Sequence, residues 1–188
     1  MMNSIDHIIG FHCAPAIRGI KLSNLVSIPR DMNDQIQVVL TEYNKQYNTL
    51  GLFFFELCRC KERRLLLVFR KRQLEAYVRQ PAVMKFLKAH GYREEWALTE
   101  MLEHLRNRME WCDSFPHEIG VFLGYPLTDV KYFIARRGAG YQLCGEWKVY
   151  TDAVGAQRAF LSYKLCREYC QTQLKLGKTF SSLVARTA

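Results

Sequence analysis

Two pairs of neighbouring residues in this chain carry side chains that do chemistry in proteins. His12 and Cys13 form the first pair, and His117 and Glu118 form the second, much later in the sequence. A thiolate is a nucleophile, and a cysteine close to an imidazole has a lowered pKa. If the fold brings the two pairs together in one pocket, we predict Cys13 as the nucleophile or a ligand, His117 as the base and Glu118 as the residue that orients His117.

The segment 115–126 supplies the predicted position of His117. Glycine is favoured just past the end of a helix, and proline is tolerated in a first helical turn. We therefore expect one helix over residues 116–123 that stops at Gly124, and a second helix that begins at Pro126. In the first turn of a helix the positive end of the dipole disfavours imidazolium, which keeps His117 available as a base.

A pocket for a small anionic molecule or cofactor is the broader prediction from the same residues. Lys21 neutralises negative charge on such a ligand, together with helix amides and the arginines near Arg70. The predicted ligand-binding residues are His12, Lys21, Asn24, Tyr125, Trp147 and Lys148. The histidines, Cys13 and Glu118 also suit zinc, iron or haem, but no metal site is predicted and the cofactor stays open. The simplest alternative is a buried Cys13, a His117 that caps its own helix and aromatic residues that only pack.

Nucleic-acid binding is the second functional hypothesis. Residues 117–137 imitate a helix-turn-helix, with a glycine break between two apolar helices and basic side chains at Lys131 and Arg136. Asp129 opposes this interpretation, because it opens the helix that would approach phosphates. A protein-interaction domain without a ligand remains a third hypothesis.

The composition predicts one soluble cytoplasmic domain over residues 1–188. Hydrophobic residues make up 49% of the chain and aromatic residues 13%, which is enough for a packed core. The apolar runs are far shorter than the ~20 residues that cross a bilayer, and the N-terminus lacks the pattern of a secretion signal. We therefore expect no membrane partner, while the oligomeric state stays open.

The seven cysteines are odd in number and scattered, which favours free thiols in a reducing compartment over a disulfide framework. The spacings of Cys58 with Cys60 and of Cys166 with Cys170 do not match structural zinc sites.

The chain is basic, with a net charge of +9. Part of this charge is local: Arg59, Lys61, Arg63, Arg64, Arg70, Lys71 and Arg72 are accompanied only by Glu62. The cluster fits phosphate binding or a solvated hairpin tip.

Apolar periodicity predicts an α+β fold, a small antiparallel or mixed sheet that carries many helices. The sheet-bearing part is expected over about residues 1–72 and a helical part over about residues 73–188. The first thirty residues read as irregular or extended. The predicted strands span residues 7–12, 24–28, 50–58 and 64–69, with a further strand pair near 141–150. The predicted helices span residues 31–48, 73–78, 81–90, 94–109, 116–123, 126–136 and 152–176, with a short one near Ser181.

Three motifs resemble those of the domain-of-unknown-function 3793 family, found mostly in anaerobic Gram-positive bacteria. They are His12-Cys13-Ala14-Pro15 with Gly19-Ile20-Lys21 and Asn24-Leu25, the Pro-His-Glu-Ile-Gly to Gly-Tyr-Pro run within residues 115–126, and Gly145-x-Trp147-Lys148-Val149-Tyr150. The sequence departs from the pattern at Arg18 and Glu146. The family carries no assigned activity, so the resemblance implies where a site lies and not what it does.

Overall fold

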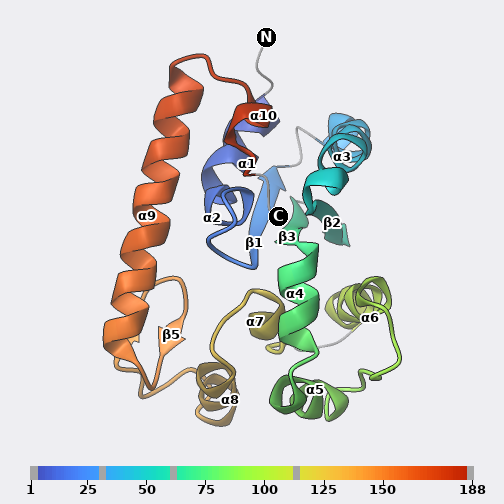
Figure 1. Cartoon of the computed structure of the whole chain (residues 1–188). Coiled ribbons are helices and arrows are strands. Elements are labelled where there is room, and N and C mark those ends of the chain that lie inside the picture. The colour runs from blue at the N-terminus through green and yellow to red at the C-terminus, as the bar shows by residue number, and fades with distance from the viewer. Residues whose placement is uncertain (1–3, 30–32, 60–62, 112–114, 186–188) are drawn as a thin grey trace.

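A three-stranded antiparallel sheet lies in the middle of the protein (Figure 1). The computed structural model describes residues 4–29, 33–59, 63–111 and 115–185. Strand β3 (Arg63–Arg70) pairs with β1 (Ser23–Pro29) on one side and with β2 (Leu52–Arg59) on the other. The central strand is covered on both faces, which explains its uninterrupted apolar run at residues 65–69.

One face of the sheet is covered by α1 (Ser4–His12), α2 (Ala14–Ile17) and α3 (Asn33–Tyr47), and the 3-10 turn η2 (Asn48–Leu50) follows α3. The C-terminal helices α9 (Ala153–Lys175) and α10 (Phe180–Leu183) pack against this layer from outside. Ile9, Val26, Val68 and Leu174 belong to one buried cluster between these helices and the sheet. Because β3 alternates its side chains, Leu67 and Phe69 point away from this cluster into a second one.

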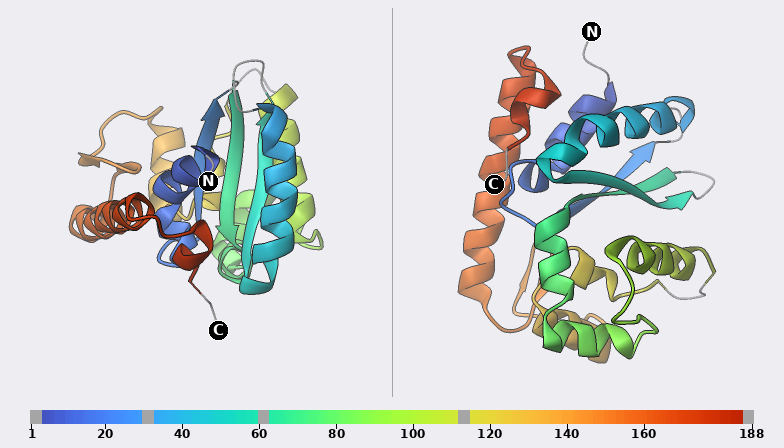
Figure 2. Two further views of the ribbon diagram at one scale, coloured as in Figure 1. Left: turned by 90° about the horizontal axis from the view of Figure 1, so that it is seen from above. Right: turned by 45° about the vertical axis from the view of Figure 1, so that its right-hand side comes forward.

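The second cluster lies between the sheet and the helices of the middle of the chain. These are α4 (Lys71–Val78), α5 (Pro81–Lys88), α6 (Leu98–Trp111), α7 (Ile119–Phe122) and α8 (Leu127–Ala135). Figure 2 shows the resulting order of layers, with the sheet between α1 and α3 on one side and α4 to α6 on the other. A short hairpin of two strands with two residues each, β4 (Leu143–Cys144) and β5 (Lys148–Val149), joins α8 to α9.

The structure confirms the α+β fold, the hairpin of β2 and β3, the strand at residues 24–28 and the strand pair near 141–150. Asp152 caps α9 by accepting a hydrogen bond from the backbone N–H of Gly155. In the described ranges, no helix combines the length and apolar character that a membrane crossing requires.

The predicted strand at residues 7–12 is wrong, because α1 occupies these residues. Ile5, Ile9 and Cys13 are all fully buried and recur every four residues, so they form the inner stripe of a helix. The helix predicted at 116–123 is also shorter than expected. Asp31, the tip of the basic hairpin at residues 60–62 and Cys112 lie outside the described residues.

Arg70 at the end of β3 ties the sheet to α2. Its side chain is 1% exposed, and it donates hydrogen bonds to the carbonyl oxygens of Ala16 (2.8 Å), Ile17 and Leu50 (3.0 Å). The backbone N–H of Arg70 also donates to the carbonyl of Leu22 at 2.8 Å. A buried charge of this kind is stable only when its donors are satisfied, and here the carbonyls that end α2 satisfy them.

We expect Arg70→Met to lower the free energy of unfolding by about 3 kcal/mol, because three internal carbonyls lose a charged donor. Urea denaturation followed by circular dichroism measures the change. Arg72→Met is the matched control on the exposed side of α4, where a loss below about 0.5 kcal/mol is expected. Equal losses for the two variants would contradict the role given to Arg70.

Candidate functional site

Two adjoining cavities lie between the end of α1, the start of β1, the loop after α7, the β4–β5 hairpin and α9. The larger one, about 500 Å³, is called the polar cavity and is lined by Phe11, His12, Lys21, Asn24, Leu25, Leu123, Tyr125, Glu146 and Arg167. The smaller one, about 310 Å³, is called the apolar cavity and is lined mainly by Leu25, Phe115, His117, Ile119, Leu123, Tyr125, Val130, Phe133, Trp147 and Lys148. Leu25, Leu123 and Tyr125 line both, so the two spaces share a wall.

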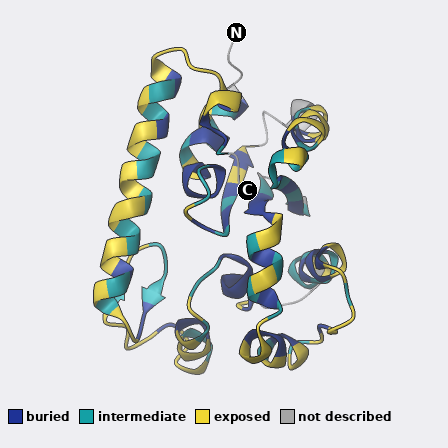
Figure 3. Cartoon of the chain, viewed as in Figure 1, coloured by how far each residue is buried: buried dark blue, intermediate teal, exposed yellow. Residues whose placement is uncertain are grey.

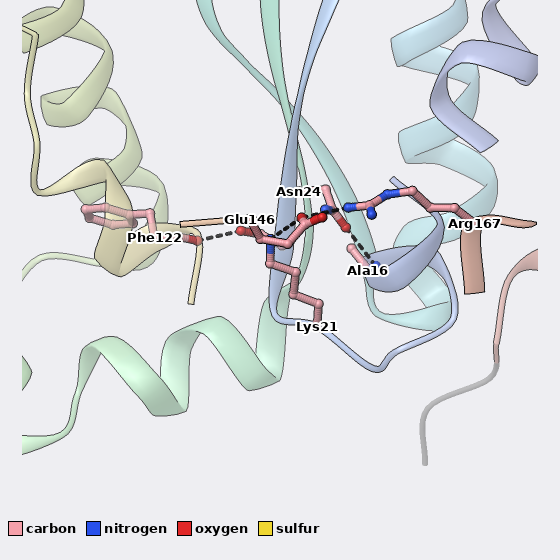
Figure 4. Close-up of polar contacts among 7 residues, drawn as sticks. Ala16, Lys21, Asn24, Phe122, Glu146 and Arg167 are labelled. Atoms are coloured by element: carbon pink, nitrogen blue, oxygen red, sulfur yellow. Dashed lines mark hydrogen bonds and ion pairs between the residues drawn. The ribbon is translucent and has the colours of Figure 1, made fainter. Parts of the chain in front are cut away.

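Three charged side chains meet in the polar cavity (Figure 4). An oxygen of Glu146, Oε2, accepts a hydrogen bond from Nη2 of Arg167 at 2.7 Å and lies 3.9 Å from Nζ of Lys21. One carboxylate thus serves two cations, each of which is largely withdrawn from water. The cluster keeps an excess of positive charge, and in a partly enclosed space such an excess attracts an anion.

Burial controls the ionisation of Lys21, which is only 6% exposed. Burial lowers the pKa of Lys21 to about 8 and the charge of Arg167 lowers it as well, while Glu146 opposes the shift. Nζ also lies 5.2 Å from the ring centre of Tyr125 and 5.4 Å from that of Tyr163 on α9. Aromatic faces attract a cation, so the two rings favour the charged form without neutralising it.

The backbone around α2 fixes the position of Lys21. Oδ1 of Asn24, a buried side chain, accepts a hydrogen bond from the backbone N–H of Ala16 at 3.0 Å. Ser23 donates its hydroxyl to the carbonyl of Phe122, which ties β1 to α7. Together with the hydrogen bonds of Arg70, these contacts fix the turn that leads from α2 through Lys21 into β1.

In the apolar cavity, the hairpin is held by a buried carboxylate. Asp129 on α8 is 2% exposed and accepts hydrogen bonds from Nε1 of Trp147 (2.9 Å) and the backbone N–H of Tyr150 (2.9 Å). It also accepts from the backbone N–H and the hydroxyl of Thr151. The ring of Trp147 is thereby placed in a stacked contact with Tyr125, with 5.2 Å between the ring centres.

All six predicted ligand-binding residues lie at these cavities. His12, Lys21 and Asn24 line the polar cavity, Trp147 and Lys148 line the apolar one, and Tyr125 lines both. Burial lowers the pKa of His12, and the charge of Arg167 lowers it further. Nζ of Lys148 donates to the carbonyl of Gly138 at 2.8 Å, which directs this amine toward the loop after α8.

Cys13 and Glu118 lie away from both cavities. Cys13 has no exposed surface, and burial raises the pKa of its thiol well above the ordinary value, although the charges of Lys21 and Arg167 act against this shift. Glu118 is 1% exposed and accepts hydrogen bonds from Arg108 and Tyr92, so its described hydrogen bonds lead away from His117. The structure therefore does not bring the predicted nucleophile, base and orienting residue into one pocket.

His117 is exposed and lies at the rim of the apolar cavity. Its ring contacts Phe133 edge-on, with 5.1 Å between ring centres. The prediction that His117 lies in the first turn of a helix is wrong, because α7 begins at Ile119 and His117 belongs to the turn before it. A helix of four residues has too small a dipole to support the predicted effect on His117.

Glu146 and Arg167 are the residues that sequence analysis missed. Arg167 lies on α9 four residues after Tyr163 and three before Cys170, a spacing that places these side chains on the side of the helix that faces the rest of the protein. A charged residue on this inner side is the sequence feature that could have identified Arg167. Glu146 was visible only as a departure from the family pattern. The hairpin carries it close to α9, where Gly145 is packed so tightly that a Cβ would clash with the ring of Phe160.

The segment of the helix-turn-helix hypothesis contains α7 and α8. Asp129 on α8 is buried against the hairpin, whereas Lys131 is exposed. The guanidinium of Arg136 lies over the rings of Tyr132 and Tyr150 and also donates to the carbonyl of Gly140. Nucleic-acid binding by this segment stays a prediction.

Comparison with known proteins places the chain in a family. The model of the family described as "Protein of unknown function (DUF3793)" matches residues 9–184, so the chain belongs to this family. No curated protein and no solved structure matches the chain.

Asp129→Ala is expected to lower the free energy of unfolding by about 3 kcal/mol, since the internal donors of Trp147, Tyr150 and Thr151 lose their acceptor. Asp129→Asn should cost less, because its amide oxygen can still accept from Tyr150 and Thr151. Thermal and urea denaturation measure both, with the exposed neighbour in Thr128→Ala as control. An Asp129→Ala variant as stable as the control would contradict the role given to Asp129.

Proposed function

We propose that this member of the DUF3793 family binds a small molecule with an anionic group at one end and an apolar or aromatic group at the other. The observation that carries the proposal is the shared wall of Leu25, Leu123 and Tyr125 between a cationic space and an apolar space. A carboxylate or phosphate is the chemistry that suits the first space, and a phenyl or short alkyl group suits the second.

The anionic end is assigned to Lys21 and Arg167. Both contact the single carboxylate of Glu146, so an incoming anion completes the charge balance that Glu146 provides only in part. Arg167 offers a planar fork of donors, and Lys21 acts as a compact charge. His12 lines the same space and is exposed, which makes it available for a hydrogen bond to the ligand.

The apolar end is assigned to the space beside Trp147. Ligand pockets are typically lined by apolar and aromatic side chains with a few polar groups that fix orientation. Val130, Phe133 and Ile119 line this space, and the stacked rings of Tyr125 and Trp147 stand beside the shared wall. A flat ring entering here gains contact area with these side chains.

Binding, rather than thiol chemistry, is the function that this geometry supports. A nucleophilic cysteine must reach its substrate as a thiolate, and Cys13 is buried with a raised pKa. The described cysteines Cys13, Cys58, Cys144, Cys166 and Cys170 are free thiols, which suits a reducing compartment. We therefore assign the binding function to the cytoplasm.

Isothermal titration calorimetry with 4-phenylbutyrate and its neutral amide, 4-phenylbutyramide, tests the proposal. We expect the carboxylate to bind at least about tenfold more tightly than the amide, a difference of about 1.4 kcal/mol, because only the carboxylate meets Lys21 and Arg167. Lys21→Met should remove this preference, and Lys85→Met, on the exposed side of α5, should keep it. Absence of carboxylate binding, or equal affinity for the two compounds in the wild-type protein, would overturn the proposal.

The affinity for 4-phenylbutyrate is also expected to depend on pH through Lys21. From neutral pH up to the Lys21 pKa of about 8, His12 is neutral because its own pKa is lowered, Lys21 is charged and the affinity changes little; above that pKa the amine loses its charge and the affinity falls. Tyr125 does not interfere, because burial raises its pKa to about 12. Lys21→Arg keeps a permanent charge, so its affinity should stay level over the range in which that of the wild-type protein declines. Parallel pH profiles for the two proteins would contradict the assignment to Lys21.

A further inference from the structure

Five large apolar side chains are exposed along α9 and the residue that follows it. Their exposed fractions are 60% for Val154, 57% for Leu161, 55% for Leu165, 51% for Tyr169 and 70% for Leu176. Tyr169 stays exposed although the guanidinium of Arg18 lies over its ring. Single exposed apolar residues are common on soluble proteins, but five on one side of a single helix mark an interaction surface, here with the exposed polar residues Arg158 and Thr172 between them. We call these five residues the α9 stripe.

The α9 stripe is symmetric about Leu165. Leu161 and Tyr169 stand four residues before and after it, and Val154 and Leu176 stand eleven residues before and after it. At about 100° per residue, all four lie within about 40° of Leu165 around the helix axis. The stripe therefore runs straight along one side of the helix and has the same spacing in both directions.

This symmetry identifies the partner as a second copy of the same helix. We infer that two copies of this protein associate through α9, antiparallel, about a two-fold axis that passes beside Leu165. Leu165 then meets its own counterpart, Leu161 of one copy meets Tyr169 of the other, and Val154 meets Leu176. A two-fold interface must be complementary to itself, and a stripe with equal spacing in both directions meets this requirement.

The charges beside the stripe also complement each other in this arrangement. Lys164 and Glu168 are both exposed and lie 3.9 Å apart within one helix. In the antiparallel pair they fall on the same flank at nearly the same height, so Lys164 of one copy stands beside Glu168 of the other. The two-fold axis repeats this contact, which opposes a parallel alignment or a shifted register.

The opposite side of α9 is already occupied within the chain. Cys170 and Leu174 are buried there, where α9 packs against α1 and α2. Figure 1 shows α9 at the outer edge of the molecule, and Figure 3 shows exposed positions along its outer side. Arg167 lies about 200° from Leu165 around the helix, so association through the stripe leaves the polar cavity open.

Sedimentation equilibrium of the wild-type protein over a dilution series tests the inference. We expect the mass of two chains, falling to that of one chain on dilution. Leu165→Glu places two like charges at the two-fold axis and should give a monomer with an unchanged circular dichroism spectrum. Lys85→Glu, an exposed change on α5, should leave the dimer intact. A wild-type protein that stays monomeric, or a Leu165→Glu variant as dimeric as the wild type, would refute it.

Oxidative cross-linking tests the antiparallel register. Leu165→Cys should cross-link to itself above the background that the natural cysteines give in the wild-type protein. Leu161→Cys should not, because its counterpart lies about 12 Å away along the axis, whereas a mixture of Leu161→Cys and Tyr169→Cys proteins should cross-link. Self cross-linking of Leu161→Cys that exceeds that of Leu165→Cys would show a different interface.

Discussion

The guanidinium of Arg70 is the interaction on which the arrangement of the site depends. It projects from the end of the central strand and donates hydrogen bonds to the carbonyls that end α2. The backbone N–H of the same residue donates to the carbonyl of Leu22. Asn24 also binds α2, by accepting a hydrogen bond from the backbone N–H of Ala16. The chain between these contacts is short, and it places Lys21 inside the protein beside α9.

This constraint determines the charge of the site. A buried lysine loses hydration, and in this cavity only the carboxylate of Glu146 compensates the charges of Lys21 and Arg167. The fold retains this costly arrangement next to an apolar space that ends at Trp147, which Asp129 holds in place. The cation, the shared wall and the aromatic lining therefore come from three separate parts of the chain. The binding proposal depends on the fold bringing these parts together. The α9 stripe acts on the other side of the helix that supplies Arg167.

The fold was more accessible from the sequence than the site. Apolar periodicity and capping residues located the hairpin, the long helix after Asp152 and the two helices around Gly124, because these signals are local. The strand expected at residues 7–12 failed because the short apolar run of α1 also fits a helix once Ile5 and Cys13 are included. Lys21, Asn24 and Trp147 were recognised by residue type, whereas Glu146 and Arg167 act only through tertiary contacts. The expected partnership of Cys13 with His117 depended on burial, which residue type does not reveal.

The binding site depends on the lowered pKa of Lys21, and heteronuclear NMR of the Lys21 side chain measures this pKa most directly. A pH titration of the Nζ and Cε resonances, assigned by comparison with Lys21→Arg, is predicted to show a midpoint near 8 in the free protein. With saturating 4-phenylbutyrate the midpoint is predicted to move upward, because the bound anion favours the charged amine. A midpoint near the ordinary lysine value of 10.5, unchanged by the ligand, would contradict the account.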